Sequence, residues 1–145
     1  MLPGLLAMGA GLAQALSLAT PWDGQPLWWL QVLAQTLLAR LLLDARSVRH
    51  AAVLGWCFAT VWLTGTFGWL YTSMHVYGGL AAPLAAVAVL ALAAFLALYW
   101  AGAAALWARL ALGQRSRVDR SFPQIRRAFI ALIFGACCLL AELAR

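Results

Sequence analysis

Long apolar stretches alternate with short polar breaks along the whole chain. The breaks hold proline, glycine and nearly all of the charged residues. About 20 apolar residues in a helix cross the roughly 30 Å hydrocarbon core of a bilayer. The pattern therefore predicts about five transmembrane helices, at approximately residues 2–19, 27–43, 51–71, 80–106 and 122–145.

The fifth stretch differs from the others in its length. Ser121 can cap its first turn, where Pro123 suits a helix start. Its apolar part, residues 128–141, extends only about 21 Å as a helix, which is short for a span. We therefore expect the natural protein to continue beyond Arg145, and a tilted or shallow terminal helix is the alternative.

Composition agrees with this pattern, because 66% of the residues are hydrophobic and only 10% are charged. Such values lie far outside the range of soluble globular domains. We interpret the chain as an all-α polytopic membrane helix bundle that forms a single membrane domain over residues 1–145. In this interpretation no residues are left over for a separate soluble domain.

The basic residues predict the orientation, since all ten are arginines and nine of them cluster beside the second and fourth breaks, with Arg145 at the outer end as a small departure. Positively charged loops stay on the cytoplasmic side. The amino terminus is therefore expected in the cytoplasm and the loop around His75 outside. The net charge of +6 is explained by this clustering, which argues against nucleic acid as a partner and favours contacts with anionic lipid.

Cysteine and histidine spacing gives no sign of a metal site or a catalytic pair. Cys57, Cys137 and Cys138 lie in apolar stretches without CxxC spacing. We expect inert thiols, no metal and no cofactor.

Small residues predict where helices approach closely. Gly65, Gly68 and Gly102 lie in the third and fourth stretches, the last of them among many alanines. Trp62 and Trp69 are seven residues apart, so one continuous helix would place them on nearly the same face.

The most specific string lies between the third and fourth stretches, where polar and aromatic residues precede a double glycine. Glycine allows backbone conformations closed to other residues, and Pro83 suits the start of the next helix. Such a loop could hold a lipid in the outer headgroup region, whereas a hydrogen-bonded structural role is the simpler reading of its lone histidine. The candidate lipid-side residues of this string are Trp69, Tyr71, His75, Tyr77, Gly78 and Gly79.

This string resembles the amino-terminal membrane region of bacterial apolipoprotein N-acyltransferases, whose approximate pattern is W-x-Y-x-S-x-H-x-[FY]-G-G followed by a proline. The family's usual A-E-W-L-R ending is matched here at Ala141, Glu142 and Arg145. Val76 and Leu143 depart from the family pattern. The resemblance extends over essentially the whole chain, and Glu142 and Arg145 are added to the candidate residues of the outer face.

The resemblance implies an enzyme of the bacterial inner membrane that transfers an acyl chain from a phospholipid to the amino-terminal cysteine of lipoproteins. It also implies a Glu-Lys-Cys triad in a nitrilase-like domain. This chain has no lysine and a single glutamate, so no catalytic residue is assigned within it. We expect the catalytic domain to lie beyond Arg145 and the chain alone to be inactive.

A small non-enzymatic membrane protein that binds lipid or a membrane partner is the competing hypothesis. A transporter is disfavoured because the first four stretches lack buried charges, apart from Arg40 near an end.

Overall fold

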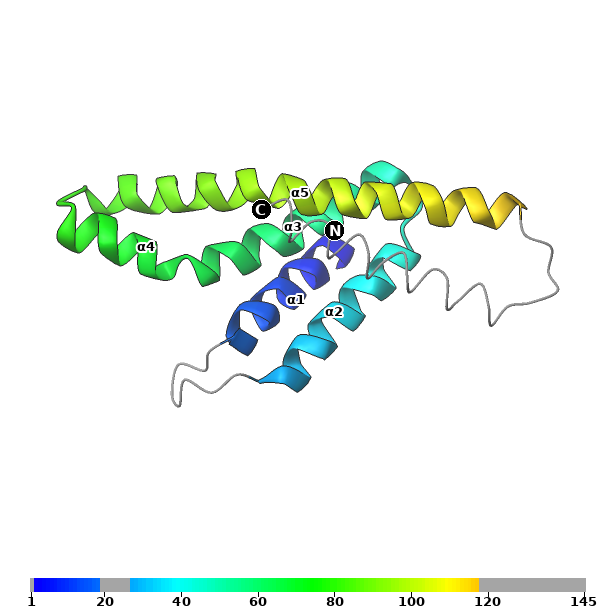
Figure 1. Ribbon diagram of the computed structural model, residues 1–145, viewed down its shortest axis with the longest axis horizontal. Helices are drawn as coiled ribbons and strands as arrows, with labels where there is room; N and C mark the ends of the chain where they lie inside the picture. Colours follow the sequence, from blue (N-terminus) through cyan, green and yellow to red (C-terminus); the bar gives the residue numbers. More distant parts are fainter. Residues whose placement is uncertain (1, 19–26, 118–145) are drawn as a thin grey trace.

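A computed structural model describes residues 2–18 and 27–117 of the 145 (Figure 1). All regular structure in these ranges is helical, which confirms the all-α class. The expected fifth span, residues 122–145, lies outside the described residues. The elements are α1 (Leu2–Leu18), α2 (Trp28–Leu43), α3 (Val48–Thr66), α4 (Gly68–Thr72), the π-helix η1 (Ser73–Tyr77) and α5 (Ala82–Arg117).

The helices differ in how well they match a bilayer. Within the described ranges, Ala82–Ala111 of α5 is the one straight helix long and apolar enough to cross a membrane. Helix α3 passes the same test only together with α4 and η1, across a bend of 50°. Helices α1 and α2, with 17 and 16 residues, are apolar but shorter. The structure thus supports one or two candidate spans beside two shorter apolar helices.

Helices α3 and α5 run antiparallel along each other and form the main axis of the structure (Figure 1). They approach closely at Gly55, where an added Cβ would lie 2.7 Å from the Ala104 Cβ. The Trp56 indole Nε1 donates a hydrogen bond of 2.9 Å to the Ala94 carbonyl oxygen. Helices in lipid associate through close backbone packing and interhelical hydrogen bonds.

Helices α1 and α2 form a hairpin that packs across α3 (Figure 1). The Cα of Gly11 faces the carbonyl oxygen of Phe58 so closely that a Cβ would collide with it. Further along, Gly65 of α3 faces the Cβ of Ala15. The expected close approach is confirmed at Gly65, whereas an added Cβ at Gly68 or Gly102 would meet no atom within 4 Å.

Aromatic rings fill the junction between α3 and α5. Trp62 and Trp100 lie edge to face with ring centroids 5.4 Å apart, and Phe58 lies 6.1 Å from each. All three side chains are buried. Edge-to-face pairs contribute about 0.5–1.5 kcal/mol beyond the area that they bury, so this junction stabilises the α3–α5 pair.

The bend at Phe67 corrects the expectation of one continuous helix over residues 51–71. Because the chain turns there, Trp62 and Trp69 do not share a face. Trp62 is 8% exposed in the junction, whereas Trp69 is 67% exposed on α4.

Two helix ends also differ from the sequence expectation. Helix α3 starts at Val48 because the Ser47 hydroxyl accepts a hydrogen bond of 3.1 Å from the His50 backbone N–H. Helix α5 continues to Arg117, beyond the expected end at residue 106. Residues 113–117, expected in a polar loop, are therefore helical.

Candidate lipid-facing site

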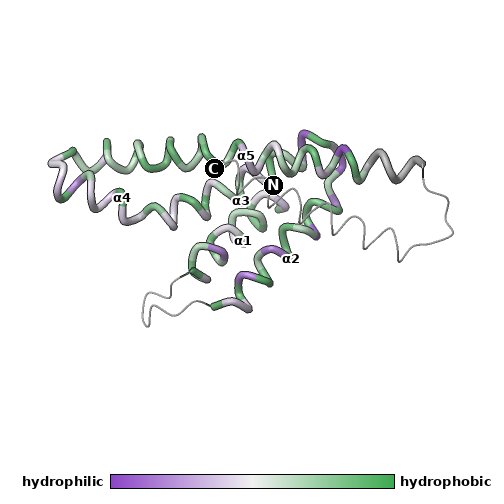
Figure 2. The backbone as a smooth tube through the Cα atoms, viewed as in Figure 1, coloured by the Kyte–Doolittle hydropathy of each residue, from purple (hydrophilic) through white to green (hydrophobic). Residues whose placement is uncertain are grey.

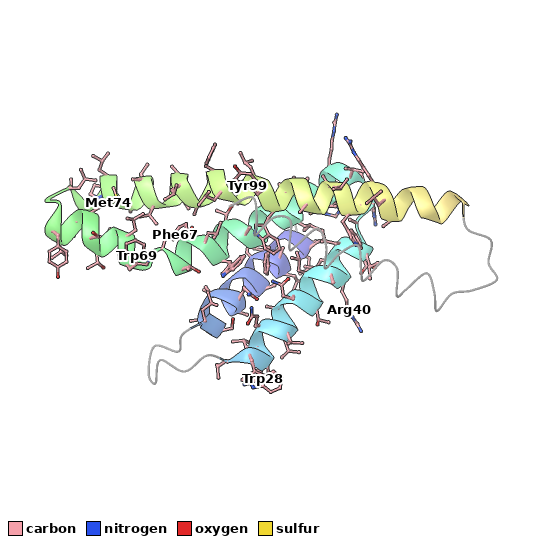
Figure 3. All side chains as sticks on the ribbon, in the orientation of Figure 1. Trp28, Arg40, Phe67, Trp69, Met74 and Tyr99 are labelled. Atoms are coloured by element: carbon pink, nitrogen blue, oxygen red, sulfur yellow. The ribbon has the colours of Figure 1, made fainter. Side chains whose placement is uncertain are left out.

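The candidate residues lie on the short helical segment that follows the bend. Helix α4 and the π-helix η1 carry Trp69, Tyr71, His75 and Tyr77, and the double glycine then leads into α5. We call residues 68–80 the outer lobe. Figure 3 shows Trp69 and Met74 at this end of the structure, far from Arg40 near the carboxyl end of α2.

Hydrogen bonds and glycine geometry fix the end of the outer lobe. The Gly78 N–H donates to the Ser73 carbonyl oxygen at 3.0 Å, and the Leu80 N–H donates to the Met74 carbonyl oxygen at 3.1 Å. Gly79 has a φ of +66°, in the left-handed region that commonly follows a helix end. An added Cβ at Gly78 would lie 2.7 Å from the Met74 carbonyl oxygen. Both glycines are therefore needed for this turn.

His75 ties the π-helix to the start of the next segment. Its Nδ1 lies 2.8 Å from the Leu80 carbonyl oxygen. A carbonyl oxygen can only accept, so His75 Nδ1 is the donor in this hydrogen bond. The imidazole also lies against the Tyr71 ring, with centroids 5.6 Å apart.

His75 has a structural role although it is exposed. The imidazole holds the turn through one nitrogen while the residue remains exposed. π-Helical turns are rare and occur frequently at functional sites.

Large side chains cover the surface of the outer lobe. Trp69 is 67% exposed, and Tyr77 is 86% exposed at the tip. Amphipathic rings of this kind sit at the level of lipid headgroups. The geometry therefore suits contact with the polar–apolar boundary of a lipid.

The outer lobe carries hydrogen-bonding and aromatic side chains. Among the described residues no group of three or more His, Cys, Asp or Glu side chains could hold a metal ion. The chain has no lysine to activate a nucleophile.

The structure brings some of the candidate residues together and leaves others untested. Tyr71 and His75 are in contact, and Gly78 and Gly79 shape the turn beside them. Glu142 and Arg145 lie outside the described residues, so their place near this face stays a prediction.

Polar residues gather at the opposite end of the α3–α5 pair. Figure 2 shows hydrophilic colour at the turn between α2 and α3, with mainly hydrophobic colour along the first half of α5. The exposed Arg46 and Arg49 belong to this turn and the following helix start, and the exposed Arg109 lies five residues past Ala104, which faces Gly55. The basic residues of two separate segments therefore share one end.

Comparison with known proteins decides the family. Residues 10–145 match the family model described as the apolipoprotein N-acyltransferase N-terminal domain. The chain belongs to the apolipoprotein N-acyltransferase family.

Three relatives named apolipoprotein N-acyltransferase support this membership. The protein of Verminephrobacter eiseniae is 55% identical over 143 residues, which cover 96% of this chain and 24% of the relative. The protein of Ralstonia nicotianae is 44% identical, with 79% of this chain and 20% of the relative covered. The protein of Bordetella bronchiseptica is 52% identical, with 72% and 20% covered. The chain thus spans about a quarter or less of each of these N-acyltransferases.

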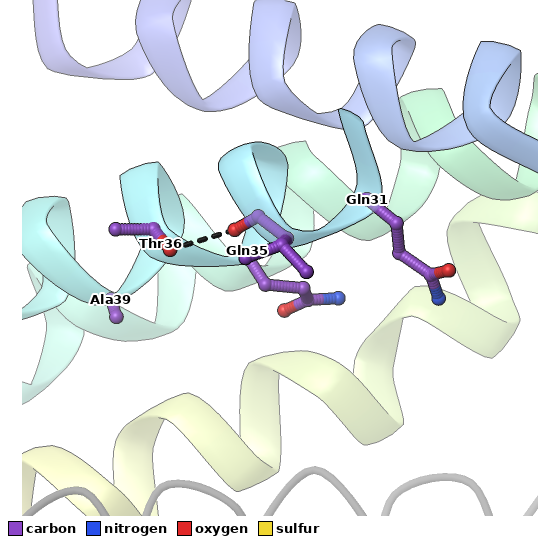
Figure 4. A pocket seen from close by; sticks show the side chains of 5 residues that line it. Gln31, Gln35, Thr36 and Ala39 are labelled. Atoms are coloured by element: carbon purple, nitrogen blue, oxygen red, sulfur yellow. Dashed lines mark hydrogen bonds between the residues drawn. The ribbon is translucent and has the colours of Figure 1, made fainter. Parts of the chain in front are cut away.

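Sequence reasoning missed a second polar surface of this N-acyltransferase domain. Gln31, Gln35 and Thr36 of α2 line a groove (Figure 4). Two amides four residues apart on an otherwise apolar helix were the available signal.

Proposed function

We propose that this chain is the membrane-anchoring and lipid-facing part of an enzyme of the bacterial inner membrane. The enzyme would transfer an acyl chain from a phospholipid to the amino-terminal cysteine of a lipoprotein. The observation that carries this proposal is the structure of the outer lobe, which has exposed aromatic rings and a histidine turn fixed by two glycines. It is supported by the membership of the chain in the N-acyltransferase family.

The chemistry of acyl transfer explains why we assign lipid binding to this chain and catalysis to another domain. The reaction breaks an ester C–O bond of the phospholipid, forms an amide C–N bond and leaves a hydroxyl on the lysophospholipid. Covalent acyl transfer needs an activated nucleophile and a base or cation beside it. The lysine-free chain is suited instead to hold the lipid at the height where a catalytic domain could reach its ester.

The charge distribution supports the proposed orientation. From Ala82 to Ala104, the helix α5 extends about 33 Å, close to the thickness of a hydrocarbon core. The outer lobe precedes this segment, whereas Arg109 follows it at the end shared with Arg46. Because arginine-rich ends stay in the cytoplasm, the outer lobe would face the periplasm.

The test is acyl transfer in vitro with purified material in phospholipid vesicles. Product of the intact gene is compared with residues 1–145 alone, using a peptide that carries a diacylglyceryl cysteine as acceptor. We expect the intact product to add one acyl chain to the free amine, detected as the mass increase, and residues 1–145 to add none.

Two outcomes would refute the proposal. If the intact product gave no transfer under conditions in which a relative is active, the acyltransferase function would be rejected. If residues 1–145 transferred acyl chains alone, the anchoring role would be wrong.

A further inference from the structure

We propose that Arg49 and Arg109 together bind the phosphate of an anionic phospholipid at the end of the α3–α5 pair opposite the outer lobe. Arg49 lies in the first turn of α3, and Arg109 lies near the carboxyl end of α5. Both side chains are exposed. The site is separate from acyl transfer, and only its assignment to the cytoplasmic leaflet rests on the orientation proposed above.

The two arginines lie at the same depth, because α3 and α5 are antiparallel and meet at Gly55 and Ala104. Arg49 precedes Gly55 by six residues, or about 9 Å of helix. Arg109 follows Ala104 by five residues, or about 7.5 Å. Since the helices run in opposite directions, both displacements lead to the same end of the pair.

The two arginines also lie on the same side of the helix pair. A helix turns by about 100° per residue, counted here in the direction of increasing residue number. Arg49 therefore lies about 120° around α3 from Gly55. Arg109 lies about 140° around α5 from Ala104. In antiparallel helices that face each other, nearly equal rotations from the facing residues lead to one side of the pair.

A hydrogen bond from the Trp56 indole to the Ala94 carbonyl oxygen marks this side. Trp56 lies about 100° around α3 from the facing residue, and Ala94 about 80° around α5. Helix α1 packs on the other side, because it meets α3 at Phe58 and Gly65, about 60° and 80° in the opposite direction. The side that carries both arginines is therefore left uncovered by helix α1.

The charges at this end favour a bound anion. Asp44 is the single acidic residue of the described ranges, and Arg46 adds a third exposed guanidinium group beside the first two. One carboxylate cannot neutralise three guanidinium groups. Arg49 also opposes the dipole of α3, whose amino-terminal end is positive. A phosphate would offset these unfavourable charges, since guanidinium groups bind phosphate oxygens through paired N–H donors.

Exposed apolar surface beneath the arginines favours a lipid over a soluble phosphate. Trp56 is 37% exposed and lies about 10 Å deeper along α3 than Arg49. Leu98 is 56% exposed, on the same side, and lies about 17 Å deeper along α5 than Arg109. Between them, an added Cβ at Gly102 would meet no atom within 4 Å, so the surface is open there. A phosphate with apolar tails therefore fits this side of the helix pair.

The test is photolabelling of the intact gene product in vesicles of phosphatidylethanolamine. A trace of phosphatidylglycerol, or of phosphatidylethanolamine in a parallel sample, carries a diazirine in its acyl chain. After irradiation and digestion, mass spectrometry locates the lipid adducts. Near Trp56 and Leu98 we expect about fivefold or more adducts from the anionic probe than from the other. The double variant Arg49→Gln/Arg109→Gln should remove this difference.

Arg40→Gln is the matched control for the single variant Arg109→Gln. Arg40 lies in the last turn of α2, on the side away from α5, and its replacement removes the same charge (Figure 3). Labelling by the anionic probe should fall in Arg109→Gln and persist in Arg40→Gln. The comparison of the two probes on the wild type uses no variant, so it tests the site even if a variant is unstable.

Three results would overturn the inference. Equal labelling by the two probes would show that the site does not select an anionic lipid. Equal losses in Arg109→Gln and Arg40→Gln would show that only the overall charge attracts the lipid. Displacement of the probe by inorganic phosphate, but not by chloride at equal ionic strength, would make a soluble anion the ligand. Acyl transfer enters none of these measurements, so their failure would leave the proposed function untouched.

Discussion

Replacing Gly79 by valine in the intact gene product should lower acyl transfer about tenfold or more. The φ of Gly79 is +66°, a conformation in which a β-branched residue is strained by about 1–3 kcal/mol. The turn can relieve this strain only by opening, which would separate His75 Nδ1 from the Leu80 carbonyl oxygen. Each 1.4 kcal/mol corresponds to a factor of ten in the population of the intact turn. The measurement is the initial rate of acyl transfer at equal amounts of membrane-inserted protein.

Gly68→Val is the matched control for this prediction. Gly68 starts α4, and an added Cβ there would meet no atom within 4 Å. Its variant should therefore keep most of the activity. Equal rates for Gly79→Val and the wild type would show that the turn has no part in the reaction.

The variant Gly11→Ala should destabilise the helix bundle by about 1–3 kcal/mol. The added Cβ would collide with the Phe58 carbonyl oxygen, which belongs to a helix backbone and cannot rotate away. Helices α1 and α3 would have to separate at their closest contact. Reversible unfolding in mixed micelles with increasing dodecyl sulfate, followed by tryptophan fluorescence, measures this loss.

Gly9→Ala provides the comparison within the same helix. No atom lies within 4 Å of a Cβ at Gly9, so this variant should be neutral or slightly more stable, because alanine favours helix over glycine. A destabilisation of equal size in both variants would mean that helix α1 does not pack on α3 through Gly11.

Apolar patterning predicted apolar helices because it reports burial in lipid or protein, but only one or two candidate spans are supported in the described residues, where four were expected. The start of α2 and the end of α1 lie within a residue of the expected limits. The bend at Phe67 escaped prediction, since the apolar stretch continues through it without proline. Both α3 and α4 contact α5 on either side of the bend, and the apolar pattern does not record such tertiary contacts.

The candidate site was also predictable only in part. The double glycine indicated a special turn, and Gly79 indeed has a positive φ. The π-helix and the bond from His75 to Leu80 were not foreseeable, because no pattern of apolar and polar residues distinguishes a π-helical turn from an α-helical one. The groove on α2 was overlooked because scattered amides in an apolar helix carry no family motif.

The most direct test of the central claim is the position of the outer lobe in living cells. The intact gene product, with its native cysteines replaced by alanine, carries either Tyr77→Cys or Arg46→Cys and is exposed to a bulky, membrane-impermeant maleimide from the periplasmic side. We predict labelling at Tyr77→Cys and no labelling at Arg46→Cys. Labelling at Arg46→Cys alone would contradict the claim that the outer lobe faces the periplasm.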